Sequence, residues 1–262
     1  MNAFSAALWA ETLKARRSKV PLMTAAGISL LPAVGGLFMI ILKDPERARA
    51  MGLISVKAQL LTAGVADWPT YFEVLSQGMG IGGAVLFAII TAWVFGREFS
   101  DHTAKELLAL PTPRETIVVA KFVLIALWIL GLSLLVFVVG LGVGAAVSIP
   151  GWSPELAWTS FWALMAIALL NLMLLPLVAL VASAGRGYLP PFGWTVLTLA
   201  LAQIIVVMGW GDWFPWSVSV LFAGMAGPRA ELLGVHSYAI VALTFVGGLL
   251  STVIWWRSAD QA

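Results

Sequence analysis

Few side chains in this chain could carry out catalytic chemistry, and they are widely separated. The histidines, His102 and His236, lie in different polar segments, and the chain has no cysteine. Hydrolases and metal sites gather several nucleophiles, bases or ligands in one place. Gly78, Gly80 and Gly83 spell G-x-G-x-x-G, but they lie in an apolar run without the preceding strand of a dinucleotide site. We therefore predict that the chain is not an enzyme and contributes no catalytic, cofactor-binding or metal-binding residue.

Glycines one helical turn apart favour helix packing instead. Gly78 with Gly82, and Gly140 with Gly144, lie four residues apart in apolar runs. Such small residues let two helices approach closely in a membrane, within one chain or between two copies.

The composition indicates an integral membrane protein. The chain has 262 residues, of which 61% are hydrophobic and 11% charged, and its mean hydropathy is +0.97. Soluble domains are about 45–50% apolar and about 25% charged. The formal net charge of +2 is too small to indicate a nucleic-acid partner. We expect an all-α protein with a single transmembrane domain over residues 1–262.

The apolar runs predict six spans, because about 20 mostly apolar residues cross a bilayer as a helix. Thr70 with Glu73 is expected to cap the second span, and Ser153 with Pro154 to begin the fourth. The expected spans are residues 20–42, 72–95, 122–147, 155–184, 190–208 and 237–256.

Two further segments do not have the length of a span. Residues 1–19 favour an amphipathic helix on the membrane surface, with a frayed basic tail as the alternative. The apolar part of the segment before the last span, residues 214–225, suits a re-entrant or interfacial segment, with a seventh span as the alternative.

The basic residues predict that both termini lie in the cytoplasm, because cytoplasmic loops carry an excess of Lys and Arg. With six spans, ten of these residues fall on the cytoplasmic side and five on the outside. Tryptophans near residues 152–162 and 210–216 then lie at the same outer face, as an aromatic belt would.

The most highly charged connector, residues 95–121, combines charges with helix-capping residues. Thr103 with Glu106 predicts a short helix from about residue 104 to 110, and Pro111 ends it. Thr112 is then expected to cap the third span. Such a helix suits a groove on another protein, although helices of this kind also lie on lipid.

This connector resembles the segment after the second span in permease subunits of type-2 ATP-binding-cassette (ABC) exporters, in particular the bacitracin and lantibiotic resistance or immunity permeases. The run AETLKARRSK at residues 10–19 is similar to the family's entry segment. His102 departs from the family, which often has glycine there. The residues that carry the resemblance are Glu98, Thr103, Lys105, Leu107, Leu108, Pro111, Arg114 and Lys121.

The resemblance implies a multi-pass permease subunit of an ABC exporter in a bacterial plasma membrane, moving an amphipathic peptide, antibiotic or lipid-like compound. Residues 96–116 would be a coupling segment that contacts a separate P-loop ATPase subunit. ATP and magnesium would bind to that subunit, and a second permease copy or a related permease would complete the route through the membrane. The expected ATPase contacts are Glu98, Asp101, Thr103, Lys105, Leu107, Leu108, Pro111 and Arg114.

Two other functions remain open from the residues alone. A membrane scaffold or assembly factor could use the same connector to recruit a partner that is not an ATPase. An ion-gradient-driven transporter is disfavoured, because the apolar cores of the six expected spans contain no Asp, Glu, Lys or Arg. Asn171 and Gln203, in adjacent spans, are weak candidates for a substrate route, since interhelical hydrogen bonds are a commoner role for such residues.

Overall fold

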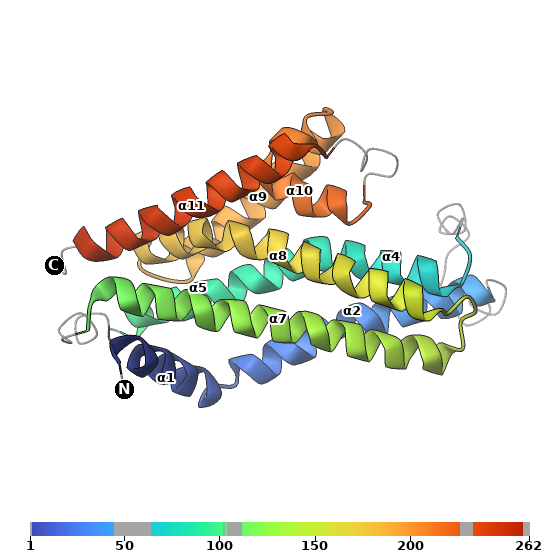
Figure 1. Ribbon diagram of the computed structural model, residues 1–262, viewed down its shortest axis with the longest axis horizontal. Helices are drawn as coiled ribbons and strands as arrows, with labels where there is room; N and C mark the ends of the chain where they lie inside the picture. Colours follow the sequence, from blue (N-terminus) through green and yellow to red (C-terminus); the bar gives the residue numbers. More distant parts are fainter. Residues whose placement is uncertain (1, 45–63, 102, 104–111, 226–232, 259–262) are drawn as a thin grey trace.

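The computed structural model describes residues 2–44, 64–101, 103, 112–225 and 233–258. Every regular element in this part of the chain is a helix (Figure 1). The elements are α1 (Ala3–Arg16), α2 (Val20–Lys43), α4 (Trp68–Gly78), the π-helix η2 (Met79–Gly83), α5 (Ala84–Ser100), α7 (Arg114–Val147), α8 (Pro154–Ala184), α9 (Leu189–Val207), the 3-10 helix η3 (Gly211–Trp213), α10 (Pro215–Phe222) and α11 (Val235–Ser258).

Six of the helical segments in the described residues are long and apolar enough to cross a membrane, which confirms the predicted number of spans. The second is Trp68–Ser100, in which α4, η2 and α5 follow one another without a break. The third, Arg114–Val147, begins eight residues before the expected position 122. The helices are therefore longer than the apolar runs that revealed them.

Helix caps explain part of this difference. Asp67, not Thr70, is the N-cap of α4, and its carboxylate accepts a hydrogen bond from the Thr70 backbone N–H at 2.9 Å. The predicted capping box of Thr70 with Glu73 is therefore wrong. The cap predicted at Thr112 is also wrong, because Pro113 precedes the first residue of α7 and makes no side-chain cap. Ser153 caps α8 as predicted, accepting from the Leu156 N–H at 3.2 Å.

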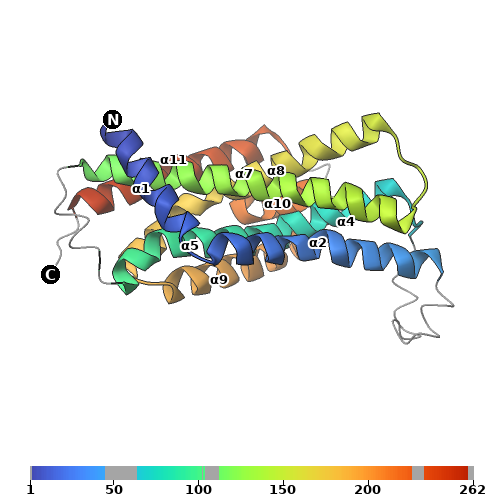
Figure 2. The same ribbon diagram turned by 90° about the horizontal axis from the view of Figure 1, so that it is seen from below.

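One end of the bundle gathers the polar ends of several helices. Figure 1 shows α1, the end of α5, the start of α7 and the end of α11 together on the left. We call this the terminal end, because the first helix and the end of the last helix both lie there. Figure 2 shows α1 lying across the first half of α7. Which side of the membrane this end faces remains a prediction.

The segment before the last span forms a short helix, α10, of eight residues. About 20 residues are needed to cross a bilayer, so α10 is too short to be a seventh span. It packs against α8, α9 and α11, with Ser217 and Val218 fully buried. A re-entrant or interfacial position in the membrane stays a prediction.

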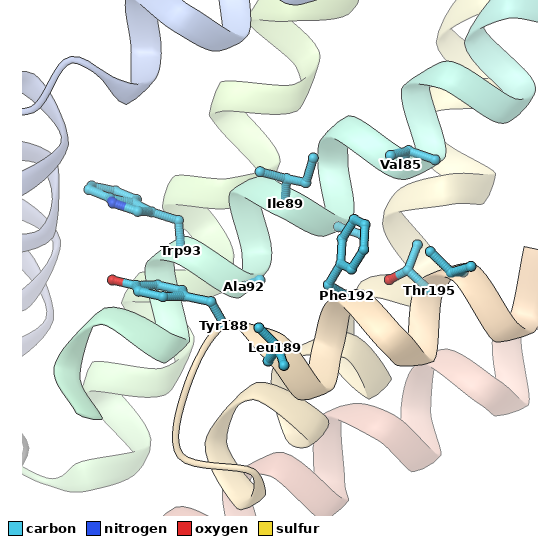
Figure 3. A pocket seen from close by; sticks show the side chains of 10 residues that line it. Val85, Ile89, Ala92, Trp93, Tyr188, Leu189, Phe192 and Thr195 are labelled. Atoms are coloured by element: carbon cyan, nitrogen blue, oxygen red, sulfur yellow. The ribbon is translucent and has the colours of Figure 1, made fainter. Parts of the chain in front are cut away.

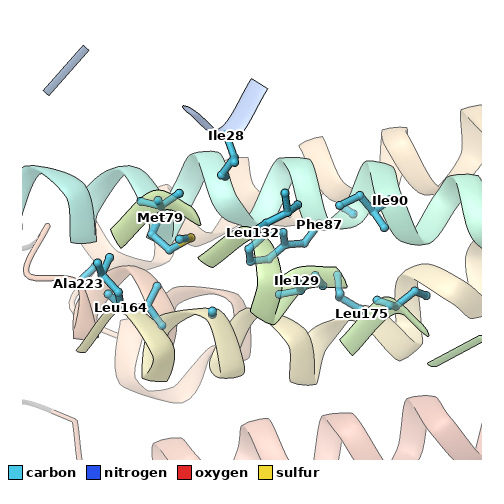
Figure 4. Packing of buried hydrophobic residues seen from close by; sticks show 14 of the residues in the cluster. Ile28, Met79, Phe87, Ile90, Ile129, Leu132, Leu164, Leu175 and Ala223 are labelled. Carbon is cyan, nitrogen blue, oxygen red and sulfur yellow. The ribbon is translucent and has the colours of Figure 1, made fainter. Parts of the chain in front are cut away.

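The bundle core is apolar and is centred on α5, α7 and α8. Figure 4 shows Phe87 and Ile90 of α5 near Ile129 of α7 and Leu175 of α8. All four are almost completely buried. Of the last two spans, α11 contributes Trp256 to the buried part of this cluster and α9 only packs against it from outside. These two spans are therefore attached at the margin of the core.

Small residues allow α4 and α7 to touch, as the glycine spacing predicted. A Cβ atom placed on Gly144 would overlap the ring of Trp68, and one on Gly140 would lie 2.8 Å from Leu75 Cδ1. Gly78 and Gly82 face Leu31 of α2 in the same way, at 3.1 and 3.3 Å. These glycines pack helices within one chain.

We expect Gly144→Val to destabilise the bundle by about 1–3 kcal/mol, because the added side chain collides with the ring of Trp68. Gly142→Val is the matched control, since a Cβ atom there meets nothing within 4 Å on the same helix. Thermal unfolding in detergent measures the difference. Equal midpoints for the two variants would contradict this account of the α4–α7 contact.

Candidate functional site: a buried ion cluster at the terminal end

A fully buried lysine, Lys121 of α7, is the centre of a group of charges at the terminal end. Its ammonium donates hydrogen bonds to Glu11 Oε2 at 2.9 Å, to Glu98 Oε1 at 2.9 Å and to the Val94 carbonyl at 3.0 Å. A lysine ammonium has three N–H donors, and all three are used. The charge is therefore both neutralised and completely hydrogen-bonded.

A second lysine closes the group. Lys14 Nζ lies 2.8 Å from Glu11 Oε1 and 2.8 Å from Glu98 Oε1. Glu11, Lys14, Glu98 and Lys121, which we call the ion cluster, together carry no net charge. They come from α1, α5 and α7, so one contact joins three helices.

Electrostatics keep Lys14 charged. Burial lowers the pKa of Lys14, but the carboxylates of Glu11 and Glu98 raise it by more, so that it lies above the ordinary 10.5. Because the folded-state pKa is raised, the stability that Lys14 contributes is complete at neutral pH and is lost only as the pH rises through this value. Lys14 is therefore positively charged at neutral pH.

The ion cluster also reaches the connector between α5 and α7. Glu98 Oε2 accepts a hydrogen bond from the Thr103 hydroxyl at 2.9 Å, and the Thr103 N–H donates to the Glu98 carbonyl at 2.9 Å. Thr103 is thus held by both the side chain and the backbone of Glu98. A displacement of the chain at Thr103 would act directly on a carboxylate shared by α1, α5 and α7.

The residues expected to contact an ATPase fall into different environments. Glu98 is buried in the ion cluster, with a side chain 2% exposed. Asp101 is half exposed and lies 3.6 Å from Arg97. Arg114 donates to the Trp256 and Arg257 carbonyls at 3.3 and 3.2 Å, tying α7 to the end of α11. The remaining expected contacts, Lys105, Leu107, Leu108 and Pro111, and the helix expected at 104–110 lie outside the described residues.

The helices that form the spans also contain ionisable residues beyond the expected apolar cores. Spans drawn to end at 95 and begin at 122 left out Glu98 and Lys121, yet both lie inside the continuous helices Trp68–Ser100 and Arg114–Val147. A prediction based on hydropathy alone ends a span at the first charged residue. A charge that has a partner in the folded chain does not end a helix.

Three members of the ion cluster, Glu11, Lys14 and Lys121, were not predicted as site residues. A sequence signal was present: Glu11 and Lys14 are three residues apart, a spacing that brings side chains together on a helix. That signal predicts a surface pair. The burial of Glu11 depends on α1 lying against α7, which no local pattern encodes.

The two weak candidates for a substrate route differ in burial. Asn171 is 2% exposed, and its amide donates to the Met79 carbonyl at 3.1 Å. Met79 begins the π-helix η2, whose altered hydrogen bonding leaves carbonyl groups in need of donors. Gln203 is exposed on α9. Asn171 thus has a structural partner, and a route lined by both residues stays a prediction.

One family of known proteins matches most of this chain. The family model described as "ABC-2 family transporter protein" matches residues 7–202, three quarters of the chain. The chain belongs to the ABC-2 transporter family. The matched region includes every member of the ion cluster and the connector at 101–113. The chain is therefore a multi-pass permease subunit of an ABC exporter in the bacterial plasma membrane.

A named relative supports the same conclusion. The chain is 29% identical over 179 residues to the bacitracin transport permease protein BCRB of Bacillus licheniformis. The similar region covers 68% of this chain and 85% of that protein. The resemblance to bacitracin resistance permeases that the connector suggested is confirmed.

We expect Lys121→Met to destabilise this ABC-2 permease by about 3–5 kcal/mol, because it leaves two buried carboxylates with too little positive charge. Lys19→Met is the matched control: it removes the same charge from an exposed position next to α1, where the cost is expected to stay below about 0.5 kcal/mol. Denaturant titration in detergent, followed by tryptophan fluorescence, measures both. Equal stabilities would show that the ion cluster does not stabilise the fold.

Proposed function

We propose that the chain moves an amphipathic peptide, antibiotic or lipid-like compound, driven by ATP hydrolysis in a separate P-loop ATPase subunit. The observation that best supports this is the ion cluster. It joins Thr103, the first residue of the connector after Asp101 that the structure describes, to three helices of the permease through Glu98.

In this proposal the ATPase subunit binds the connector at residues 104–110 and displaces it when it closes on ATP. The displacement passes through Thr103 to Glu98, and from there to Lys121 in α7 and Lys14 in α1. Because buried ion pairs are costly to separate in a low dielectric, these helices move together and not independently. ATP and magnesium bind to the partner, since the chain has no G-x-x-x-x-G-K-[ST] sequence of its own.

The substrate class comes from similarity to a relative named as a bacitracin transport permease. A second permease copy, identical or related, completes the route in this proposal. The terminal end faces the cytoplasm, as the ten basic residues expected on that side predict.

Leu107→Asp and Leu108→Asp test the contact with the ATPase, because a carboxylate placed in an apolar groove without a partner weakens binding. We expect both variants to lose copurification of the proposed ATPase subunit, together with the ATP turnover of the complex. Leu53→Asp, in the connector that follows α2, is the control and keeps both. Unaltered assembly and turnover in the Leu107 and Leu108 variants would exclude the proposed contact.

Thr103→Val tests transmission separately from binding, because it removes the hydroxyl that donates to Glu98 while keeping the shape of the side chain. We expect the ATPase subunit to copurify as before, and substrate-stimulated ATP turnover to fall severalfold. Thr159→Val is the control: Thr159 is exposed near the start of α8, and its hydroxyl donates to carbonyls of its own helix. Equal stimulation in the two variants would rule out transmission through Thr103.

A further inference from the structure

A cavity of about 440 Å³ lies between α5 and the first half of α9. Its size falls within the range of about 300–1,000 Å³ that is usual for small-molecule sites. Figure 3 shows Trp93 and Tyr188 at one end of the cavity and Val85 toward the other. The wall is almost entirely apolar, and the hydroxyl of Thr195 already donates to the Pro191 carbonyl at 2.8 Å.

The cavity opens to the outside of the bundle. Leu189, Phe192 and Val196, which line it, are 84%, 55% and 51% exposed. In a membrane-spanning chain this face is reached from the hydrocarbon of the bilayer. From Val85 to Arg97, helix α5 rises about 18 Å at about 1.5 Å per residue. That length is close to one leaflet, since the hydrocarbon core is about 30 Å thick.

A cation lies at the end of the cavity nearest the terminal end of the bundle. The guanidinium of Arg97 lies over the Trp93 ring, 4.7 Å from its centroid. Arg97 Nη1 is buried and has no hydrogen-bond partner in the described part of the chain. Nη2 is only loosely paired, 3.6 Å from the half-exposed carboxylate of Asp101. A buried N–H of a charged group without an acceptor is costly. The Arg97 side chain as a whole is 23% exposed, so part of it can be reached by an external acceptor.

Tyr188 packs against α5 at the same end of the cavity. It lies against α5 where Gly96 has no side chain, since a Cβ there would come within 3.1 Å of Tyr188 Cδ1 and 2.9 Å of the Gly187 carbonyl oxygen. Trp93 and Tyr188 thus frame the cavity next to Arg97. Tryptophan and tyrosine rings favour the level of lipid headgroups.

We propose that this cavity binds one acyl chain of an anionic phospholipid, taken from the leaflet at the terminal end, with a headgroup phosphate accepting hydrogen bonds from Arg97. The apolar wall, the stretch of α5 from Val85 to Arg97 with the length of about one leaflet, and the Arg97 N–H that no described residue accepts all match this occupant. The proposal does not depend on the proposed transport function, because lipid retention is measured on the purified chain without an ATPase subunit.

Native mass spectrometry of the purified chain, released from nanodiscs of equal phosphatidylglycerol and phosphatidylcholine, tests the site. We expect the wild type to retain one phosphatidylglycerol in preference to phosphatidylcholine. Arg97→Gln is expected to lower that retention about tenfold, because a charge-assisted hydrogen bond is lost. Val196→Trp, which fills the opening of the cavity, lowers the retention of both lipids.

Two controls match these changes in charge and size. Arg17→Gln removes an exposed arginine beside α1, and Leu243→Trp enlarges an exposed side chain of α11 outside the cavity; both are expected to retain lipid as the wild type does. Equal retention by Arg97→Gln and Arg17→Gln would overturn the headgroup contact. Equal retention by Val196→Trp and Leu243→Trp would overturn the acyl-chain site.

The competing occupant is a second copy of the chain, and it can be tested directly. The chain has no cysteine, so Phe192→Cys introduces a single thiol at the rim of the cavity. The lipid proposal expects maleimide labelling of the introduced thiol to be blocked by phosphatidylglycerol in detergent and restored by Arg97→Gln. Rapid disulfide cross-linking of two chains through that thiol, unaffected by added lipid, would assign the cavity to a permease–permease contact and overturn the proposal.

Discussion

The ammonium of Lys121 imposes the strongest constraint on this fold. A buried charge is tolerated only if its hydrogen bonds and its countercharges are both supplied. For Lys121 these come from Glu11 of α1, from Glu98 of α5 and from the Val94 carbonyl. No one helix could supply them, so α1, α5 and α7 must assemble together. The requirement holds a helix that is not a span, α1, against α7 at the terminal end of the bundle.

Apolar packing holds the helices together in the middle of the bundle, and polar contacts hold them together at the terminal end. In the middle, packing of Phe87, Ile129 and similar side chains, together with glycine faces such as that of Gly144, brings the helices close without selecting a direction of movement. Lipid is as apolar as these side chains, so close packing and polar contacts, and not the hydrophobic effect, hold such helices together. At the terminal end, Glu98 and Arg114 form discrete contacts that must break or move as units. The apolar middle of the bundle can therefore adjust by small side-chain movements, whereas the polar contacts fix the positions of the helices at the terminal end.

Much of the fold could be predicted from the sequence, because the thickness of the bilayer sets the number of apolar residues that a spanning helix needs. Six apolar runs indicated six spans, and the short α10 followed from a run of about a dozen residues. The ends of the helices were harder to predict from the sequence. Asp67 replaced Thr70 as a cap, and the helices ran past the charges at Glu98 and Lys121, because capping and ion pairing depend on atoms that hydropathy does not represent. The ion cluster was missed for the same reason: Glu11 and Lys121 are separated by 110 positions, and only packing joins them.

Why the bundle keeps a buried ion cluster, where apolar side chains could pack as well, is a question of specificity. Replacing buried ion pairs by well-packed apolar residues is often neutral or stabilising, so stability alone does not explain the arrangement. An apolar contact between α1, α5 and α7 would tolerate sliding. The bonds of Glu98 to Lys14, Lys121 and Thr103 define one register, because each requires an oxygen within hydrogen-bond distance of a particular donor. Directional bonds of this kind would pass a displacement at Thr103 to three helices, as the proposed coupling to an ATPase subunit requires.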